Sequence, residues 1–255
     1  MQSRPTVVAR EVRMRVAALY DIHANLPAVE AVLADVDRAG VDLVLVGGDF
    51  AWGPLPRGTL DRLMSLEDRV RFIRGNADRE VATRADDPEL GERMASINRW
   101  CYDQLTGQQI EFLAGLTDRA VIEIDELGPT LFCHGSPRSD EEPITLGTSD
   151  TLLQAMLADV AQTVVVCGHT HAQFDRTVGT KRVVNPGSVG LPFGAPRSTY
   201  WALFGPGVEL RRTDYDVTAA EARFRASGVP HAEWFVKQIL SPPPERVAVE
   251  RFTRG

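Results

Sequence analysis

The stretch Val164-Val165-Val166-Cys167-Gly168-His169-Thr170-His171 decides how the rest of the chain is interpreted. Its three valines predict a buried strand, and Gly168 allows a sharp turn at the end of that strand. Two imidazoles two residues apart on an extended segment point to the same side, which is typical of a ligand pair. Four of the five histidines of the chain lie just beyond the end of an apolar run, namely His23, His134, His169 and His171. The sequence therefore predicts a metal site at the carboxyl ends of a set of strands.

The composition is that of an ordinary globular protein with a sizeable core. The 255 residues are 44% hydrophobic and 25% charged, which fits one large domain. The net charge is -7 and no long basic run occurs, so we expect no binding to duplex nucleic acid. No stretch approaches the roughly 18 apolar residues needed to span a membrane, and we expect no membrane association. Three widely spaced cysteines exclude a disulfide framework or zinc knuckle and favour a cytoplasmic location: Cys101, Cys133 and Cys167.

Apolar periodicity and turn residues predict an alternation of strands and helices, with helices covering sheets on both outer faces. We expect strands at residues 14–20, 41–46, 69–73, 121–124, 130–133, 163–167, 200–204 and 208–212. We expect helices at residues 27–39, 59–65, 91–105, 107–115, 149–161, 218–227 and 231–240, and a turn at Asp86-Asp87-Pro88. Residues 1–13 are predicted to be a flexible lead-in, residues 14–240 a single domain, and residues 241–255 an extended tail after Pro242 to Pro244.

Unusual polar residues follow the predicted strands, each at the point where a strand ends. They are Asp21-Ile22-His23, Gly48-Asp49, Gly75-Asn76, His134 and Gly168-His169-Thr170-His171. Each motif by itself is weak, since Gly-Asp and Gly-Asn are more often turns and a lone histidine is often satisfied by a backbone carbonyl. In open α/β sheets, however, ligands sit beyond the carboxyl ends of the strands. Together, in this order, the motifs predict one site.

The five motifs resemble the signature of the calcineurin-like metallophosphoesterase superfamily over residues 14 to about 190. The segment Asn185-Pro186-Gly187-Ser188-Val189-Gly190 is most similar to its small bacterial and archaeal phosphodiesterase branch. The resemblance implies an α/β (α+β) fold, a four-layer α-β-β-α sandwich of two mixed sheets flanked by helices, with two metals at its edge. By the same resemblance, Asp21, His23 and His171 match the ligands of the first metal, Asn76, His134 and His169 those of the second, and Asp49 the carboxylate that bridges both.

The chemistry of this ligand set agrees with the resemblance. Carboxylate, imidazole and amide oxygen suit Mn²⁺, the preferred candidate, or Ni²⁺, Fe²⁺, Co²⁺ or Zn²⁺, and argue against a thiolate site. Two bridged divalent ions ~3.5–4 Å apart lower the pKa of a shared water to about 7. The catalytic group is then a hydroxide held at Asp49, which attacks phosphorus in line. Asp78 matches an acidic residue of the same signature, and we interpret it as a partner that orients a ligand imidazole.

One position departs from the family pattern and bears on the substrate. Many members carry histidine after the Gly-Asn motif as a general acid, whereas this chain has Ala77. Loss of general-acid assistance forfeits about 10²–10⁴ in rate for a poor leaving group. The substrate is therefore expected to be a small phosphodiester or an activated phosphate ester. Candidate substrate contacts are Arg74, Arg138 and Trp52, although the sequence fits solvated surface arginines at least as well, and core packing is the commoner fate of such a tryptophan.

Two rival functions stay open at this point, as does the oligomeric state. The first is a protein or nucleotide phosphatase. The second is a non-catalytic scaffold with the same fold, although such scaffolds usually have eroded ligand sets and here all the ligand positions are filled. A homo-oligomer is compatible with apolar residues in the last hairpin and helices.

Overall fold

A computed structural model of the chain describes residues 14–84 and 91–252. The predicted lead-in over residues 1–13 and the predicted turn at Asp86-Asp87-Pro88 lie outside the described residues.

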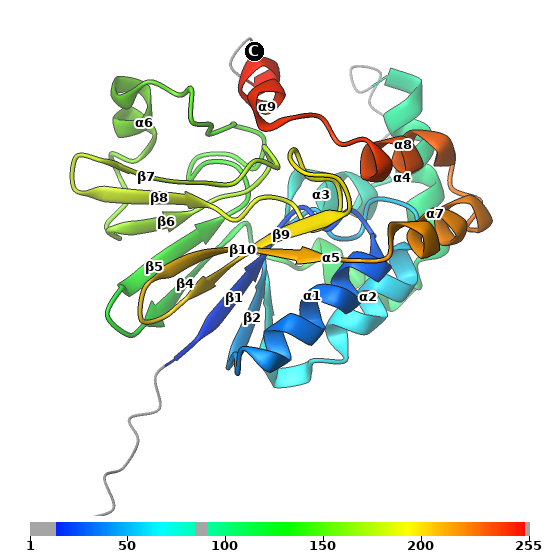
Figure 1. Ribbon diagram of the computed structural model, residues 1–255, viewed down its shortest axis with the longest axis horizontal. Coiled ribbons are helices and arrows are strands. Elements are labelled where there is room, and N and C mark those ends of the chain that lie inside the picture. The colour runs from blue at the N-terminus through cyan, green and yellow to red at the C-terminus, as the bar shows by residue number, and fades with distance from the viewer. Residues whose placement is uncertain (1–13, 85–90, 253–255) are drawn as a thin grey trace, which may run out of the picture.

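Two five-stranded mixed sheets pack face to face, as the resemblance implied, and helices flank them (Figure 1). The first sheet has the order β10 (Val208–Asp214), β9 (Ser198–Phe204), β1 (Val16–Leu19), β2 (Leu43–Val46) and β3 (Val70–Phe72). The second has the order β4 (Arg119–Ile124), β5 (Gly128–Cys133), β6 (Val164–Val166), β8 (Lys181–Asn185) and β7 (Phe174–Val178). In the first sheet β1, β2 and β3 run parallel, and each leads to a predicted ligand. In the second sheet β5, β6 and β8 run parallel, and the first two lead to predicted ligands.

Most helices cover the outer face of the first sheet, on the right in Figure 1. These are α1 (Leu26–Arg38), α2 (Pro56–Met64), α3 (Asn76–Ala82), α4 (Gly91–Gln104), α5 (Gly107–Ala114), α7 (Val217–Ala226) and α8 (Ala232–Leu240), with a 3₁₀ turn at Glu67–Arg69. The outer face of the second sheet packs against α6 (Asp150–Met156). None of the helices in the described ranges is both long and apolar enough to cross a membrane.

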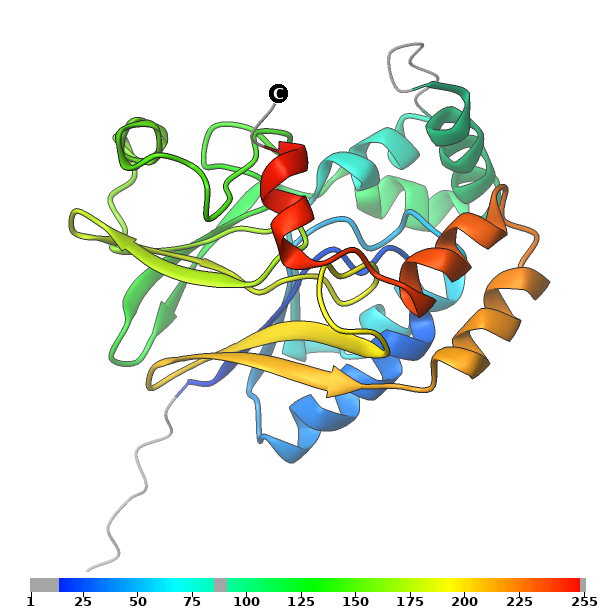
Figure 2. The same ribbon diagram turned by 45° about the horizontal axis from the view of Figure 1, so that its top comes forward.

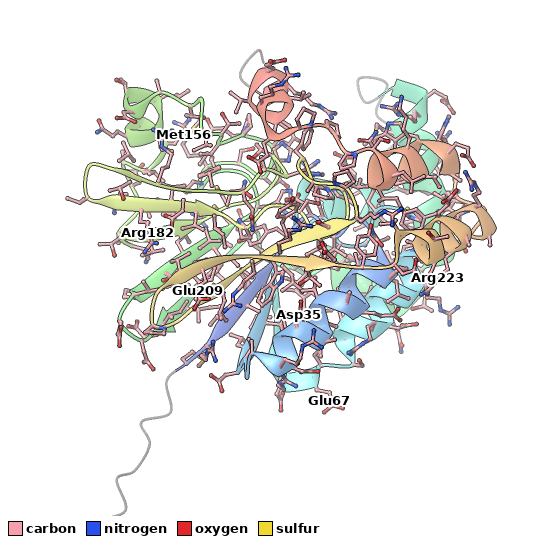
Figure 3. The ribbon with its side chains drawn as sticks, viewed as in Figure 1. Asp35, Glu67, Met156, Arg182, Glu209 and Arg223 are labelled. Carbon is pink, nitrogen blue, oxygen red and sulfur yellow. The ribbon has the colours of Figure 1, made fainter. Side chains whose placement is uncertain are left out.

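The apolar strand β1 shows why its residues are hydrophobic on both sides. Successive side chains of a strand point to opposite faces. Ala17 and Leu19 pack in the core beneath the helices, whereas Val16 and Ala18 pack in the core between the two sheets. A strand buried on both faces needs a continuous apolar run, and the polar residues can begin only where the strand ends. Charged side chains such as Glu67 and Glu209 lie at the outer surface (Figure 3).

The predicted extended tail is wrong over residues 245–252, which form the helix α9 (Glu245–Phe252). Figure 2 shows this last helix lying near the loops at the carboxyl ends of the strands. The three prolines end α8, but the carbonyl of Pro244 accepts a hydrogen bond of 2.9 Å from the N–H of Val247. Proline has a backbone angle suited to the start of a helix, so the same prolines that stop one helix can precede another.

Two strands, β7 and β8, and the helix α3 were not predicted either. The strand β7 pairs antiparallel with β8 at the edge of the second sheet, with exposed Asp175 and Thr177 alternating with buried residues. The helix α3 begins at Asn76, where the Gly-Asn pair had indicated only a turn. The acidic residue of its first turn, Asp78, accepts a hydrogen bond from the N–H of Gly75 at 3.1 Å, which caps the helix.

The core between the sheets is expected to carry much of the stability. Phe132 is fully buried there, with its ring centroid 5.7 Å from that of Phe204. Phe132→Ala should lower the free energy of unfolding by about 3–5 kcal/mol, because the cavity it leaves cannot collapse between two sheets. Urea unfolding measures this effect. The control Val121→Ala, at a side chain that is 54% exposed, should change it by less than about 0.5 kcal/mol, and equal effects would contradict the assignment of this core.

Candidate metal centre

Five loops at the carboxyl ends of β1, β2, β3, β5 and β6 converge on one place. Three predicted ligands, Asp21, His23 and His171, form one group whose ligand atoms lie within 4.8 Å of one another. A second group has the same property and consists of Asp49, His134 and His169. Asn76 adjoins the second group, because the N–H of the next residue donates a hydrogen bond of 2.9 Å to Asp49 Oδ1. The structure thus brings six of the seven predicted metal ligands together, in two groups that could each hold an ion, and Asn76 lies next in sequence to a residue that contacts the second group.

The backbone of these loops is strained where it presents the ligands. Positive φ angles, which non-glycine residues rarely adopt, occur at Asp21 (50°), His23 (46°), Asp49 (55°), His169 (65°) and His171 (58°). Such strain persists only where the surroundings enforce it, and it clusters at functional sites. The expectation that His169 and His171 lie on an extended segment is therefore wrong. The chain bends at both residues, and their imidazoles enter different groups.

The carboxylate of Asp49 lies between the two groups. Its Oδ2 atom is 3.3 Å from Nε2 of His134 and 3.9 Å from Nε2 of His23, which belongs to the other group. Its Oδ1 atom accepts the N–H of Ala77. The loops that carry these residues are also joined directly, since the N–H of His23 donates a 2.7 Å hydrogen bond to the carbonyl of Asp49. Asp49 therefore has the position expected of a bridging ligand.

The hydrogen bonds of two imidazoles fix which nitrogen faces the site. Nδ1 of His134 lies 2.9 Å from the carbonyl oxygen of Gly47, and Nδ1 of His171 lies 2.7 Å from that of Leu191. A carbonyl only accepts, so each Nδ1 carries a proton, and Nε2 is the ring nitrogen that faces the site. Nε2 of His171 is 3.1 Å from Nε2 of His23. Two nitrogens bound at ~2.0–2.1 Å to one ion lie about 3.0–3.4 Å apart, so this spacing suits a shared cation.

Burial sets the protonation state of three imidazoles. It lowers the pKa of His23 and of His169 to about 4, and that of His171 well below its ordinary value. Because these rings are largely neutral near pH 7, their lone pairs are available to a metal ion without loss of a proton.

The carboxylate of Asp21 responds to burial in the opposite way. Burial raises the pKa of Asp21 well above that of an ordinary aspartate, since its charge has little access to water. Burial alone would lower the pKa of His134, but the charges of Asp49 and Asp21 outweigh it and raise that pKa to about 10. The cluster thus favours positive charge between its carboxylates, and a divalent cation would supply it.

Asp78 does not contact an imidazole. Its carboxylate accepts hydrogen bonds from the backbone N–H groups of Asp49 (2.7 Å), Phe50 (2.9 Å), Ala51 (2.9 Å) and Gly75 (3.1 Å). These amides belong to the loop after β2 and to the start of α3. Asp78 therefore orients the backbone that carries two ligands, and the interpretation that it orients a ligand imidazole is corrected.

The three candidate substrate contacts lie in different surroundings. Trp52 is 2% exposed, and its ring packs edge-on against His23 at 5.4 Å, so it supports a ligand and has no face open to a substrate. Arg138 is exposed in the loop after His134 and forms an ion pair with Glu142. Arg74 is half-buried at the end of β3. A contact between either arginine and a substrate stays a prediction.

Three polar residues that the sequence did not mark as functional hold the ligand loops. Nδ2 of Asn185 donates to the carbonyl of Gly168 at 3.0 Å, and Oγ of Ser188 donates to the carbonyl of Asp21 at 2.7 Å. Glu80 accepts a hydrogen bond of 3.3 Å from Nδ2 of Asn76. The first two lie in a segment that was quoted only for its family resemblance. The third is one helical turn after Asn76, a spacing that becomes visible once α3 is known.

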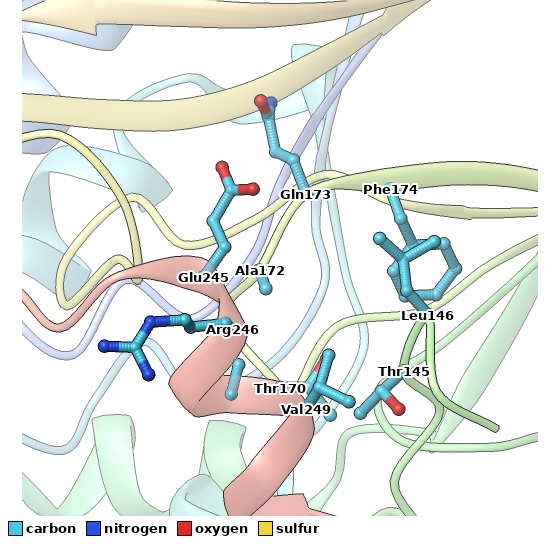
Figure 4. Close-up of a pocket in the computed structure, with 10 residues that line it drawn as sticks. Thr145, Leu146, Thr170, Ala172, Gln173, Phe174, Glu245, Arg246 and Val249 are labelled. Atoms are coloured by element: carbon cyan, nitrogen blue, oxygen red, sulfur yellow. The ribbon is translucent and has the colours of Figure 1, made fainter.

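The C-terminal helix α9 packs against the histidine loop. The ring centroid of Phe252 lies 5.5 Å from that of His169. Beside this contact, a pocket of about 160 Å³ separates α9 from residues 170–174 (Figure 4). Its lining is mostly apolar and includes Leu146, Phe174 and Val249. The end of the chain thus forms part of the surroundings of a ligand that lies more than 80 residues earlier.

Known proteins share this sequence pattern and this fold. Residues 14–204 match the calcineurin-like phosphoesterase superfamily domain. The hypothetical protein PH1004 from Pyrococcus horikoshii OT3 has a TM-score of 0.78 over 91% of this chain and 99% of that chain, at 20% identity. A metallophosphoesterase from Sphaerobacter thermophilus has a TM-score of 0.70 over 89% and 98%, at 25% identity. Phosphodiesterase YfcE from Escherichia coli strain K12 is 28% identical over 200 residues, covering 74% of this chain and 87% of that protein.

The close approach of Gly75 to the site gives a direct test of its geometry. A Cβ atom at Gly75 would lie 2.1 Å from Oδ1 of Asp49, so Gly75→Ala must displace that carboxylate. We expect the variant to lose phosphoesterase activity and to bind fewer Mn²⁺ ions, measured by elemental analysis after desalting. Gly107→Ala is the matched control, because a Cβ there meets nothing within 4 Å. Unchanged metal content in the Gly75 variant would contradict the arrangement described.

Proposed function

We propose that this protein hydrolyses a small phosphodiester or an activated phosphate ester with the help of two divalent ions. The chain belongs to the calcineurin-like phosphoesterase superfamily, in its small bacterial and archaeal branch, and is a hydrolase of phosphoric ester bonds. The observation that carries the proposal is the pair of adjoining ligand groups with Asp49 between them.

The donor atoms fit such ions. Oδ1 of Asn76 is buried and has no hydrogen-bond partner among the described residues, an arrangement that is unfavourable unless a cation binds it. The set contains only oxygen and nitrogen donors, which favours Mn²⁺, with Ni²⁺, Fe²⁺, Co²⁺ or Zn²⁺ as alternatives. Asp21, His23 and His171 would hold the first ion, Asn76, His134 and His169 the second, and Asp49 would contact both.

The residues of the chain would bind the two ions and keep the two ligand groups oriented toward each other. When bound, two divalent ions would lower the pKa of water to about 7 and offset the negative charge of the phosphate. Asp49 keeps the two groups in register, because one of its oxygens is tied to the backbone of α3 and the other faces both groups. Asp78 holds the same loop through three backbone N–H groups and the start of α3 through a fourth, so its carboxylate is already occupied.

The lack of a general acid bears on the substrate class. Ala77 is 3% exposed and has no proton to donate to a leaving group. Substrates with a leaving group of low pKa should therefore react fastest. A small phosphate ester is the proposed partner.

We assign the activity to the cytoplasm, because the cysteines are all free and buried and none depends on an oxidising compartment.

A hydrolysis panel tests the proposal. The protein should hydrolyse aryl diesters and aryl monoesters in the presence of Mn²⁺ and should hydrolyse neither when a chelator is added. With Mn²⁺, alkyl monoesters should react about 10²–10⁴ times more slowly than aryl esters. Nucleoside monophosphates and a phosphopeptide belong in the same panel. Faster turnover of either would favour a nucleotide or protein phosphatase instead. A protein that purifies without metal and does not respond to Mn²⁺, Ni²⁺ or Zn²⁺ would overturn the proposed mechanism.

Removal of single ligands tests the two groups. His171→Ala affects the first group, and Asp49→Ala affects the position between them. Each should reduce kcat/KM for an aryl diester by more than about 100-fold, since perturbing even the partners of ligands has effects of 10–100-fold. His231→Ala should leave it unchanged, because that histidine is exposed and outside both groups. Full activity in the Asp49 variant would refute the two-ion mechanism.

A further inference from the structure

Glu80 is a buried carboxylate close to the proposed second ion. It is 5% exposed and lies on α3, four residues after Asn76, so the two side chains share one face of the helix. Its Oε1 atom accepts a hydrogen bond from Nδ2 of Asn76 at 3.3 Å. Its Oε2 atom accepts one from Nδ2 of Asn98, on α4, at 3.3 Å. Both carboxylate oxygens thus face amide donors from two different helices.

This contact determines which end of the Asn76 amide faces the metal groups. An ionised carboxylate accepts hydrogen bonds and does not donate, so it selects the NH₂ end of an amide. With Nδ2 of Asn76 turned to Glu80, Oδ1 is turned away from it, and this oxygen is buried without a partner. Only the oxygen end of an amide binds a divalent cation. Without Glu80, nothing among the described contacts of Asn76 would distinguish its two orientations.

The surroundings of Glu80 are unusual for a buried acid. Among the described residues, no arginine, lysine or histidine lies within ion-pair distance of it, and its side-chain partners are the two neutral amides. Burial raises its pKa above the ordinary value, while the hydrogen bonds from both asparagines lower it. A buried carboxylate without a cationic partner is costly to maintain, which suggests a role other than stability.

We propose that Glu80 is a positioning residue for the second metal ion, because it orients the Asn76 side chain so that Oδ1 faces the ion, with Asn98 holding Glu80 in place. The inference rests on the proposed function for the presence of that ion, but it does not depend on the substrate.

Isothermal titration with Mn²⁺ tests this role. In Glu80→Gln an NH₂ group replaces one of the two oxygens, so the side chain can no longer accept from Asn76 at one oxygen and from Asn98 at the other. The second Mn²⁺ equivalent should bind about 10–100-fold more weakly, and the first should be unaffected. The matched control is Glu209→Gln, an exposed glutamate of β10 far from the loops, which should bind both equivalents as the unmodified protein does. Unchanged affinity for the second equivalent in Glu80→Gln would overturn the proposal.

The same substitution made in an Asn76→Asp variant distinguishes two roles of Glu80, orientation of the Asn76 side chain and stabilisation of the fold. In Asn76→Asp, a carboxylate faces the carboxylate of Glu80, and the like charges repel each other. Glu80→Gln should then strengthen Mn²⁺ binding relative to Asn76→Asp alone, because the glutamine NH₂ can donate to the new aspartate. A merely structural role for Glu80 predicts weaker binding in both backgrounds, and this result would overturn the proposal. If the single variant does not fold, the comparison of Asn76→Asp with the double variant carries the test.

The same titration distinguishes this inference from the proposed function. Two Mn²⁺ equivalents with no esterase activity would refute the function and leave the role of Glu80 standing if the reversal is seen. An active enzyme whose second equivalent is insensitive to Glu80 in both backgrounds would refute only the role of Glu80.

Discussion

The buried carboxylate of Asp49 is the interaction on which the rest of the site depends. It lies between imidazoles that come from opposite sheets, His23 beyond β1 and His134 beyond β5. Such a charge is stable in the interior only when positive charge or hydrogen-bond donors surround it. The two sheets must therefore pack with their strand ends in one particular register. The apolar core between the sheets provides the packing energy, and the polar edge determines the register.

The loops around this carboxylate are held by backbone contacts more than by side-chain pairs. Asp78 binds four N–H groups, and Asn185 and Ser188 bind the loops that carry the other ligands. These contacts explain how several ligand residues remain at positive φ. Such a backbone conformation costs of order 1–3 kcal/mol per residue and persists only when the surrounding contacts enforce it.

The sequence predicted the alternation of strands and helices, and the polar residues at the strand ends, because both follow from local patterns. The two-sheet sandwich and the assignment of metal ligands came from the family resemblance. Buried strands need apolar runs, so the first polar residues after those runs stand out, as Asp21 and His134 do. Other features depend on contacts that no local pattern encodes. The acceptor role of Asp78 arises from backbone amides 27 to 29 residues away, and Trp52 is covered by a helix that comes 180 residues later. The helix α9 was missed because proline can end one helix and precede the next.

The first ligand group joins Asp21 and His23 to His171, which comes much later in the sequence. Neither part alone contains a complete group, so a chain that is still being synthesised has no such site until residue 171 has emerged and folded. Contacts between residues so far apart in sequence form late and slowly, because the entropy cost of closing the loop comes before the contacts stabilise the chain. An ion that binds only the closed arrangement acts on the folding equilibrium as a whole, with a contribution of RT ln(1 + [M]/Kd). The supply of metal to the cell would then influence how much of this protein survives to be used.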